Sequence, residues 1–147
     1  MRRFGEPVRE GPYYRPRPGA YAIIWHGDRL LMTVQHKPYY ELQLPGGGID
    51  AGEGQLAALH REAFEETGWR IAPVRRLGAY RRYTYMPEYE RWAAKTCHIW
   101  LARAIMRYAP PSEPYHEVRS LHPSEVMDQL RLAGDADFLR RHLAGLI

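Results

Sequence analysis

A run of glycines followed by a proline-free helical segment constrains the fold of this chain more than any other sequence feature. Pro45 and the glycines at 46–48 end a short strand predicted over 41–44, because proline cannot donate to a sheet and glycine favours loops. The segment 54–67 contains good helix formers without proline or internal glycine, and Gly68 is a favoured residue just past a helix C-terminus. We therefore predict a strand, a glycine loop and a helix as one continuous unit.

Further strand-like runs flank this unit on both sides. Two apolar runs precede it, at 20–25 and 30–34, and turn residues at 26–28 join them into a predicted β-hairpin. Two longer runs follow it, at 75–85 and 96–105, and we expect them to pair antiparallel. Strands interleaved with a few helices indicate an α/β fold, with a mixed sheet between helical layers.

The chain length of 147 residues is typical of one domain. Residues 1–18 contain four prolines and scattered charge, a composition that favours an extended arm over a packed element. We therefore expect an N-terminal arm over 1–18 and a single domain over 19–147. Near the C-terminus, Ser124 and Asp135 are predicted to be the N-caps of two closing helices.

Composition limits the classes of protein to consider. Cys97 is the only cysteine, so an intrachain disulfide and a cysteine-based zinc cluster are both excluded. A single thiol fits the reducing cytoplasm, and no window approaches the roughly 20 apolar residues of a membrane span. The net charge of +4 permits an anionic ligand, but the arginines are spread along the chain, which is also typical of a generally solvated basic surface.

The helix predicted over 54–67 has an acidic face. At about 100° per residue, Glu62, Glu65 and Glu66 fall within one arc of roughly 100°. The broadly opposite side, expected to face the core, carries Leu56, His60, Ala63 and Thr67. Glutamates at such spacings repel one another, and a divalent cation turns that repulsion into binding. A solvated charged face with no ligand is the alternative interpretation.

The same residues resemble a known family signature. Gly47, five further residues, Glu53, seven further residues, and then the sequence REAFEETGW at 61–69 resemble the Nudix box. This box is typical of hydrolases acting on nucleoside diphosphates linked to another group. The order of elements on both sides resembles the Nudix α/β/α sandwich. Two positions depart from the box. It usually has a larger aliphatic residue where Ala63 stands and an aliphatic residue where Trp69 stands.

The resemblance implies a metal site and a reaction. Glu62, Glu65 and Glu66 would be the metal ligands, with Mg²⁺ as the cation and Mn²⁺ as a substitute. The cation would neutralise phosphate charge, lower the pKa of a bound water and align it for attack at phosphorus. The expected substrate is a nucleotide-like small molecule.

The resemblance also implies roles for residues around the metal ligands. Glu53 would complete the acidic cluster, and Arg61 would hold the box carboxylates in position. Gly46, Gly47 and Gly48 would shape the loop near the phosphates.

The general base is left open by the sequence. In this family it is a box glutamate such as Glu65 or a carboxylate outside the box, for which Glu117 is the best candidate. An ordinary surface role for Glu117 is an equal alternative. The pair His116-Glu117 does not form a zinc-protease signature, because His122 comes too late for that spacing.

Three functions remain in competition: a hydrolase, a nucleotide-sensing domain and a basic nucleic-acid-binding module. Intact box carboxylates favour a hydrolase over a related domain that senses a nucleotide without cleaving it. The segment 80–85 combines arginine with tyrosine, which could serve base stacking or phosphate binding but is also typical of ordinary strand packing. Nucleic acid is expected as a partner only as the 5′ end of an RNA substrate, no membrane partner is expected, and a homodimer is left open.

Overall fold

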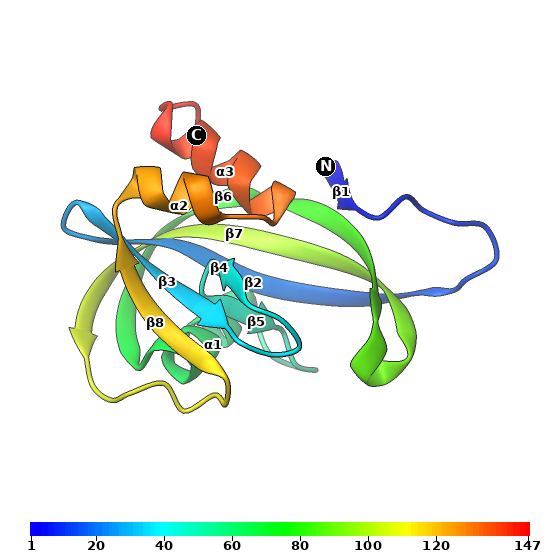
Figure 1. The fold of residues 1–147 in the computed structure, drawn as a ribbon, viewed down its shortest axis with the longest axis horizontal. Helices are drawn as coiled ribbons and strands as arrows, with labels where there is room; N and C mark the ends of the chain where they lie inside the picture. Colours follow the sequence, from blue (N-terminus) through cyan, green and yellow to red (C-terminus); the bar gives the residue numbers. More distant parts are fainter.

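The computed structural model describes all 147 residues, and all eight strands belong to one twisted sheet (Figure 1). Its main path runs in the order β1-β6-β7-β2-β3-β4, while β5 pairs with β2 and β8 pairs with β3. The sheet is mixed, because β1 lies parallel to β6 and β2 parallel to β7, whereas the other pairs are antiparallel. The strands are β1 (Arg2–Gly5), β2 (Tyr14–His26), β3 (Arg29–Gln35), β4 (Glu41–Gln43), β5 (Gly46–Gly48), β6 (Trp69–Met86), β7 (Arg91–Arg107) and β8 (His116–Leu121).

Helices cover both faces of the sheet, as Figure 1 shows. Helix α1 (Gln55–Thr67) lies on one face, and α2 (Pro123–Gln129) and α3 (Ala133–Leu143) lie together on the other. A short 3-10 turn, η1 (Pro87–Tyr89), joins β6 to β7. None of the helices combines the length and apolar character that crossing a bilayer requires. The predicted α/β/α arrangement with a mixed sheet is confirmed.

The alternation of side chains along β2 explains why the molecule has a core on each face of the sheet. Ala22 and Ile24 belong to the buried cluster that includes Leu59 of α1. Ile23, between them, belongs to the cluster that includes Phe138 of α3. Successive strand residues point to opposite faces, so an apolar run in a central strand packs against both helical layers. Each such buried aliphatic side chain contributes about 1.5–3 kcal/mol.

The predicted hairpin and helix are both present. The turn between β2 and β3 contains Gly27 at a φ of 63°, a conformation that glycine adopts without strain. Helix α1 ends at Gly68, which has a φ of 75° and donates its N–H to the carbonyl of Phe64. The two long strands β6 and β7 pair antiparallel as expected, over longer ranges than predicted.

The structure differs from the prediction at the glycine run, which forms a strand of its own. After β4 ends, the three glycines of β5 pair antiparallel with residues 19–21 of β2. The sheet also extends into the segment predicted to be an extended arm, because β2 begins at Tyr14 and β1 pairs with β6. The division of the chain at residue 18 stays a prediction.

The N-caps predicted for the two closing helices are wrong. The N-cap of α2 is His122, whose side chain accepts a hydrogen bond from the Ser124 N–H, so Ser124 lies inside the helix. The N-cap of α3 is Leu132. Asp135 lies in the first turn of α3 and is buried, where its carboxylate accepts a hydrogen bond from the Tyr80 hydroxyl at 2.6 Å.

Candidate active site

Helix α1 is held against the sheet by a face that differs from the predicted one. Its buried residues are Ala58, Leu59, Ala63, Glu66 and Thr67. Leu56, which was expected in the core, is 45% exposed. Glu66, which was expected on the open acidic face, is only 6% exposed, because β5 and β8 both lie against this part of the helix.

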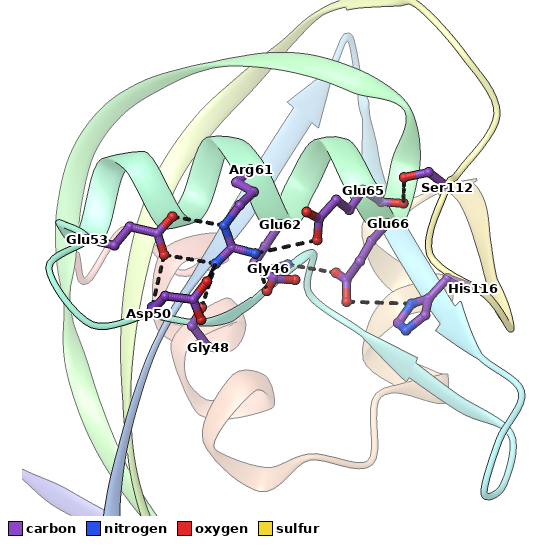
Figure 2. A network of polar contacts seen from close by, with 10 residues as sticks. All are labelled: Gly46, Gly48, Asp50, Glu53, Arg61, Glu62, Glu65, Glu66, Ser112 and His116. Carbon is purple, nitrogen blue, oxygen red and sulfur yellow. Dashed lines mark hydrogen bonds and ion pairs between the residues drawn. The ribbon is translucent and has the colours of Figure 1, made fainter.

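Arg61 joins the acidic side chains of the site (Figure 2). Its Nε and Nη2 donate to the two carboxylate oxygens of Glu53, each at 2.8 Å. Its Nη1 donates to Glu62 at 2.9 Å and more weakly to Glu65 at 3.5 Å, and Nη2 also reaches the carbonyl of Gly48 at 3.0 Å. A planar guanidinium suits such a fork, which a lysine could not reproduce. The structure therefore brings four predicted site residues together around one cation.

Glu53 is fixed by the loop that precedes α1. The backbone N–H of Asp50 donates to the Glu53 carboxylate at 3.0 Å, and the Glu53 N–H donates back to the Asp50 carbonyl at 3.0 Å. Hydrogen bonds from Arg61, and then from the Asp50 backbone, lower the pKa of Glu53 to about 2. The Asp50 carboxylate itself lies 3.4 Å from Arg61, and sequence reasoning did not identify it. The sequence signal that could have identified Asp50 is its position between two predicted site residues, Gly48 and Glu53.

Glu66 lies under the glycine strand and beside β8. The Gly46 N–H donates to one carboxylate oxygen at 2.9 Å, and Nδ1 of His116 lies 3.6 Å from the other. Burial raises the pKa of Glu66 well above its ordinary value, and the neighbouring acids Glu62, Glu113 and Glu65 raise it further. This carboxylate is therefore one that a nearby positive charge would stabilise.

His116 is a site residue that sequence reasoning considered only as part of a zinc-protease signature. Its Nδ1 lies 3.0 Å from the hydroxyl of Thr33 and faces Glu66. The loop before β8 is fixed to α1 because the backbone N–H groups of Ser112 and Glu113 both donate to the Glu65 carbonyl at 2.9 Å. Figure 2 shows the longer bond from the Ser112 hydroxyl to the same carbonyl, at 3.5 Å. No sequence pattern indicated this contact, since it depends on how β8 pairs with β3.

The glycine strand β5 permits an approach that a side chain would block. A Cβ at Gly47 would lie 2.5 Å from the carboxyl carbon of Glu62. Gly46 has a φ of 146°, and a Cβ there would lie 2.2 Å from the carbonyl oxygen of Ala20. Both glycines are therefore required by the close packing of β5 between β2 and α1.

Glu117 does not contact the carboxylates of α1 in the structure. It is the neighbour of His116 on β8 and so points to the opposite face of the strand. Its side chain is 47% exposed and pairs with Arg119 and with His36, the latter at 2.7 Å. These two partners, Arg119 first, lower its pKa. A catalytic role for Glu117 stays a prediction.

The donor set fits a hard divalent cation. Four carboxylates pair with the guanidinium of Arg61, those of Asp50, Glu53, Glu62 and Glu65. A fifth, that of Glu66, interacts with Glu62 and Glu65. No three acidic, histidine or cysteine side chains converge in the geometry of a formed metal centre, and Arg61 lies among the acids instead. Carboxylate oxygens are the ligands that Mg²⁺ prefers, commonly one or two together with substrate phosphates.

A cavity of about 210 Å³ adjoins these carboxylates. Glu66 and the glycines of β5 line one side of it, and Tyr21, Tyr80 and Cys97 of the sheet line another. A ligand can approach the backbone of β5 at Gly48, where a Cβ would meet no atom within 4 Å. The arrangement provides a polar pocket next to a concentrated negative charge.

Comparison with known proteins points in one direction. A family model described as NUDIX domain matches residues 15–142. A protein named 8-oxo-(d)GTP phosphatase from Mycolicibacterium smegmatis is 33% identical over 135 residues, which cover 83% of this chain and 40% of that protein. An RNA pyrophosphohydrolase from Bartonella henselae is 47% identical over 49 residues, which cover 32% of this chain and 28% of that protein. The chain thus spans less than half the length of these curated relatives.

A solved structure shows the same fold. The NUDIX hydrolase from Nitrosomonas europaea superimposes with a TM-score of 0.73 at 17% identity, covering 89% of this chain and 90% of the other.

Proposed function

The chain belongs to the Nudix hydrolase family, and from this premise we propose that it hydrolyses a diphosphate linkage in a nucleotide derivative with the help of Mg²⁺. The observation that carries the proposal is the Arg61-centred cluster, in which one guanidinium holds Glu53, Glu62 and Glu65 beside the buried Glu66. The names of the relatives, phosphatase and pyrophosphohydrolase, support the same type of reaction. The retained acids favour hydrolysis over nucleotide sensing.

Glu62, Glu65 and Glu66 are the proposed ligands of the cation, with Mn²⁺ as a substitute for Mg²⁺. A bound divalent cation neutralises phosphate charge and lowers the pKa of a bound water. The chain supplies the positioning: Arg61 fixes the angle of Glu62 and Glu65, and the Gly46 N–H fixes one oxygen of Glu66. Side chains held in place before the substrate arrives cost no reorganisation during the reaction.

The 5′ end of RNA is a second candidate substrate, and a cluster of aromatic rings near the start of β2 favours it. There the guanidinium of Arg9 lies 5.1 Å from the ring of Trp92, which packs against Tyr14 and Tyr85. Aromatic rings and arginine planes are the surfaces on which single-stranded bases stack. Steeply salt-dependent binding of a 5′-triphosphate RNA would support this candidate.

Glu66→Gln tests the proposed function. The amide keeps the shape of the side chain and an oxygen to accept from the Gly46 N–H, but it removes the ligand charge. We expect Mg²⁺-dependent cleavage of nucleoside diphosphate derivatives, measured as the nucleoside monophosphate formed, to fall at least about a hundredfold. Because the wild-type carboxylate is buried among other acids, the melting temperature should stay the same or rise slightly.

The control is Glu10→Gln, which removes one negative charge from an exposed residue near the N-terminus. It should turn over like the wild type. Unchanged turnover in Glu66→Gln would refute the assignment of Glu66, whereas a folded wild type that cleaves no diphosphate derivative would refute the proposed function itself.

A further inference from the structure

Three cations lie side by side on adjacent strands of the sheet. Arg82 of β6 is directly opposite Lys95 of β7, and Lys95 is directly opposite Arg17 of β2. Residues directly opposite one another project from the same face of a sheet, so the three side chains form a row, here called the cation row. Like charges in such positions destabilise the sheet. The row therefore has a cost that the fold alone does not explain.

No carboxylate lies within ion-pair distance of Lys95 or Arg82, although Glu88 acts on Lys95 and Asp135 on Arg82 at longer range. Neither residue forms an ion pair, although the chain has ten such pairs elsewhere. Burial, and then the nearby Arg82, lower the pKa of Lys95. A partly buried ammonium beside a second cation is stabilised by an anion placed between them.

The row stands where two cavities meet. Lys95 and Arg82 line the 210 Å³ cavity that contains Glu66, and they also line a second cavity of about 210 Å³ toward the end of the β6–β7 hairpin. The second cavity is bounded by Tyr39, Tyr85 and Met86, which offer ring and apolar surface. A ligand extending from the carboxylates of α1 to these rings would pass over the two cations.

Two amides and several carboxylates are among the remaining polar groups that line the passage. The amides of Gln35 and Gln43, linked to each other at 3.0 Å, line both cavities. Glu41 also borders the second cavity, but its carboxylate accepts from the Gln43 amide at 2.7 Å. Glu88 lies in the turn η1 at the outer end. Asp135, which accepts a hydrogen bond from Tyr80, also lines the first cavity. Lys95 and Arg82 are the two cations that line both cavities, and they stand at the junction.

We propose that Lys95 and Arg82 bind a second phosphate group of the substrate, separate from the diphosphate that is hydrolysed beside Glu66. The inference rests on the proposed function and narrows its substrate class to nucleotides that carry a further phosphate or phosphodiester. That group has two possible sources: a longer phosphate chain leading to a second nucleoside, or a phosphate on the 3′ oxygen of the ribose, as in RNA. A Lys and Arg pair recognises either source by the same charge-assisted hydrogen bonds.

Two matched pairs of probes separate the sources. Adenosine 5′-diphosphate and adenosine 3′-phosphate 5′-diphosphate differ by the ribose phosphate, and diadenosine diphosphate and diadenosine tetraphosphate differ by the chain. Binding is measured by calorimetry with EDTA present, so that it does not depend on a metal or on turnover. In the wild type, the phosphate-richer member of one pair should bind more tightly, and this pair identifies the source.

Lys95→Met should weaken binding of that phosphate-richer probe about tenfold or more, the usual effect of losing a charge-assisted hydrogen bond, and should change the poorer probe by less than about twofold. With Mg²⁺, the same loss should appear in KM for the richer substrate while kcat changes little. The matched control is Arg103→Met, an exposed cation of β7 that lines neither cavity, for which both probes should bind as in the wild type.

Equal losses for both members of each pair, or no loss, would overturn the proposal. Arg82→Met provides an independent variant of the same row, and it decides the matter if Lys95→Met melts at a much lower temperature. A wild type that binds the richer probe through Lys95 yet hydrolyses nothing would sink the proposed function while leaving the anion site in place. A wild type that hydrolyses diphosphates but shows no preference between the probes would overturn the anion site and leave the proposed function in place.

Discussion

At the residue scale, Asp135 predicts a dependence of stability on pH. Its carboxyl is buried beneath the Tyr80 hydroxyl, and burial raises its pKa from an ordinary 3.8 to about 6. Between these values the folded chain holds a proton that the unfolded chain has released, so the free energy of unfolding falls as pH rises from about 4 to about 6. The loss attributable to Asp135 is on the order of 1–3 kcal/mol.

Asp135→Asn keeps an acceptor for the Tyr80 hydroxyl and removes the titration. Glu66 titrates with the same sign, so the quantity to measure is the difference between wild type and variant in urea midpoints at pH 4.5 and pH 7. We expect the variant to gain stability relative to the wild type at the higher pH. Parallel pH curves for the two proteins would show that the Asp135 carboxyl is not perturbed.

The same residues show how far the sequence identifies single side chains. The spacing of the family signature indicated Arg61, Glu53, Glu62 and Glu65, and the structure places them in contact. The burial of Glu66 could not be predicted from the sequence, because it depends on β5 and β8 lying over the helix rather than on the helical period. Asp135, Asp50 and His116 were missed or misassigned for the same reason: each is defined by a partner distant in sequence or by a loop conformation.

At the element scale, the strand β5 predicts a difference between two neighbouring glycines. An added methyl at Gly47 would collide with the Glu62 carboxylate, whereas an added methyl at Gly48 would have no atom within 4 Å. Gly47→Ala should displace Glu62 from Arg61 and lower kcat about tenfold or more. Gly48→Ala should lower it much less, and nucleoside monophosphate formation by the two purified variants measures the difference. Equal activities would show that Glu62 can move away at no cost.

The elements themselves were largely predictable, and the exceptions have physical causes. The hydrophobic runs and the positions of the glycines correctly predicted the β2–β3 hairpin and α1. The glycines of β5 carry no side-chain pattern, so only their backbone hydrogen bonds to β2 reveal a strand. The cap of α2 is a histidine, a residue outside the usual set, whose ring nitrogen replaces the oxygen of serine or aspartate.

At the scale of the whole molecule, the net charge of +4 conceals two opposite local charges. Four carboxylates gather around Arg61 with Glu66 beside them, and two members of the cation row, Arg82 and Lys95, line the adjoining cavity. A phosphate-rich ligand would be repelled by the first group and attracted by the second. A divalent cation bound by the carboxylates reverses the repulsion, so that the two ends of the passage become complementary to one anionic substrate.

This charge distribution predicts that Mg²⁺ alone stabilises the fold. A cation that binds the folded chain at ten times its Kd adds about 1.4 kcal/mol, which corresponds to a rise of about 4 °C in Tm for a domain of this size. The rise should exceed that given by NaCl at equal ionic strength, since screening alone also relieves repulsion among the acids. Glu66→Gln should reduce the rise and Glu10→Gln should not. An equal rise with NaCl, or an undiminished rise in Glu66→Gln, would mean that the carboxylates of α1 do not hold the cation jointly.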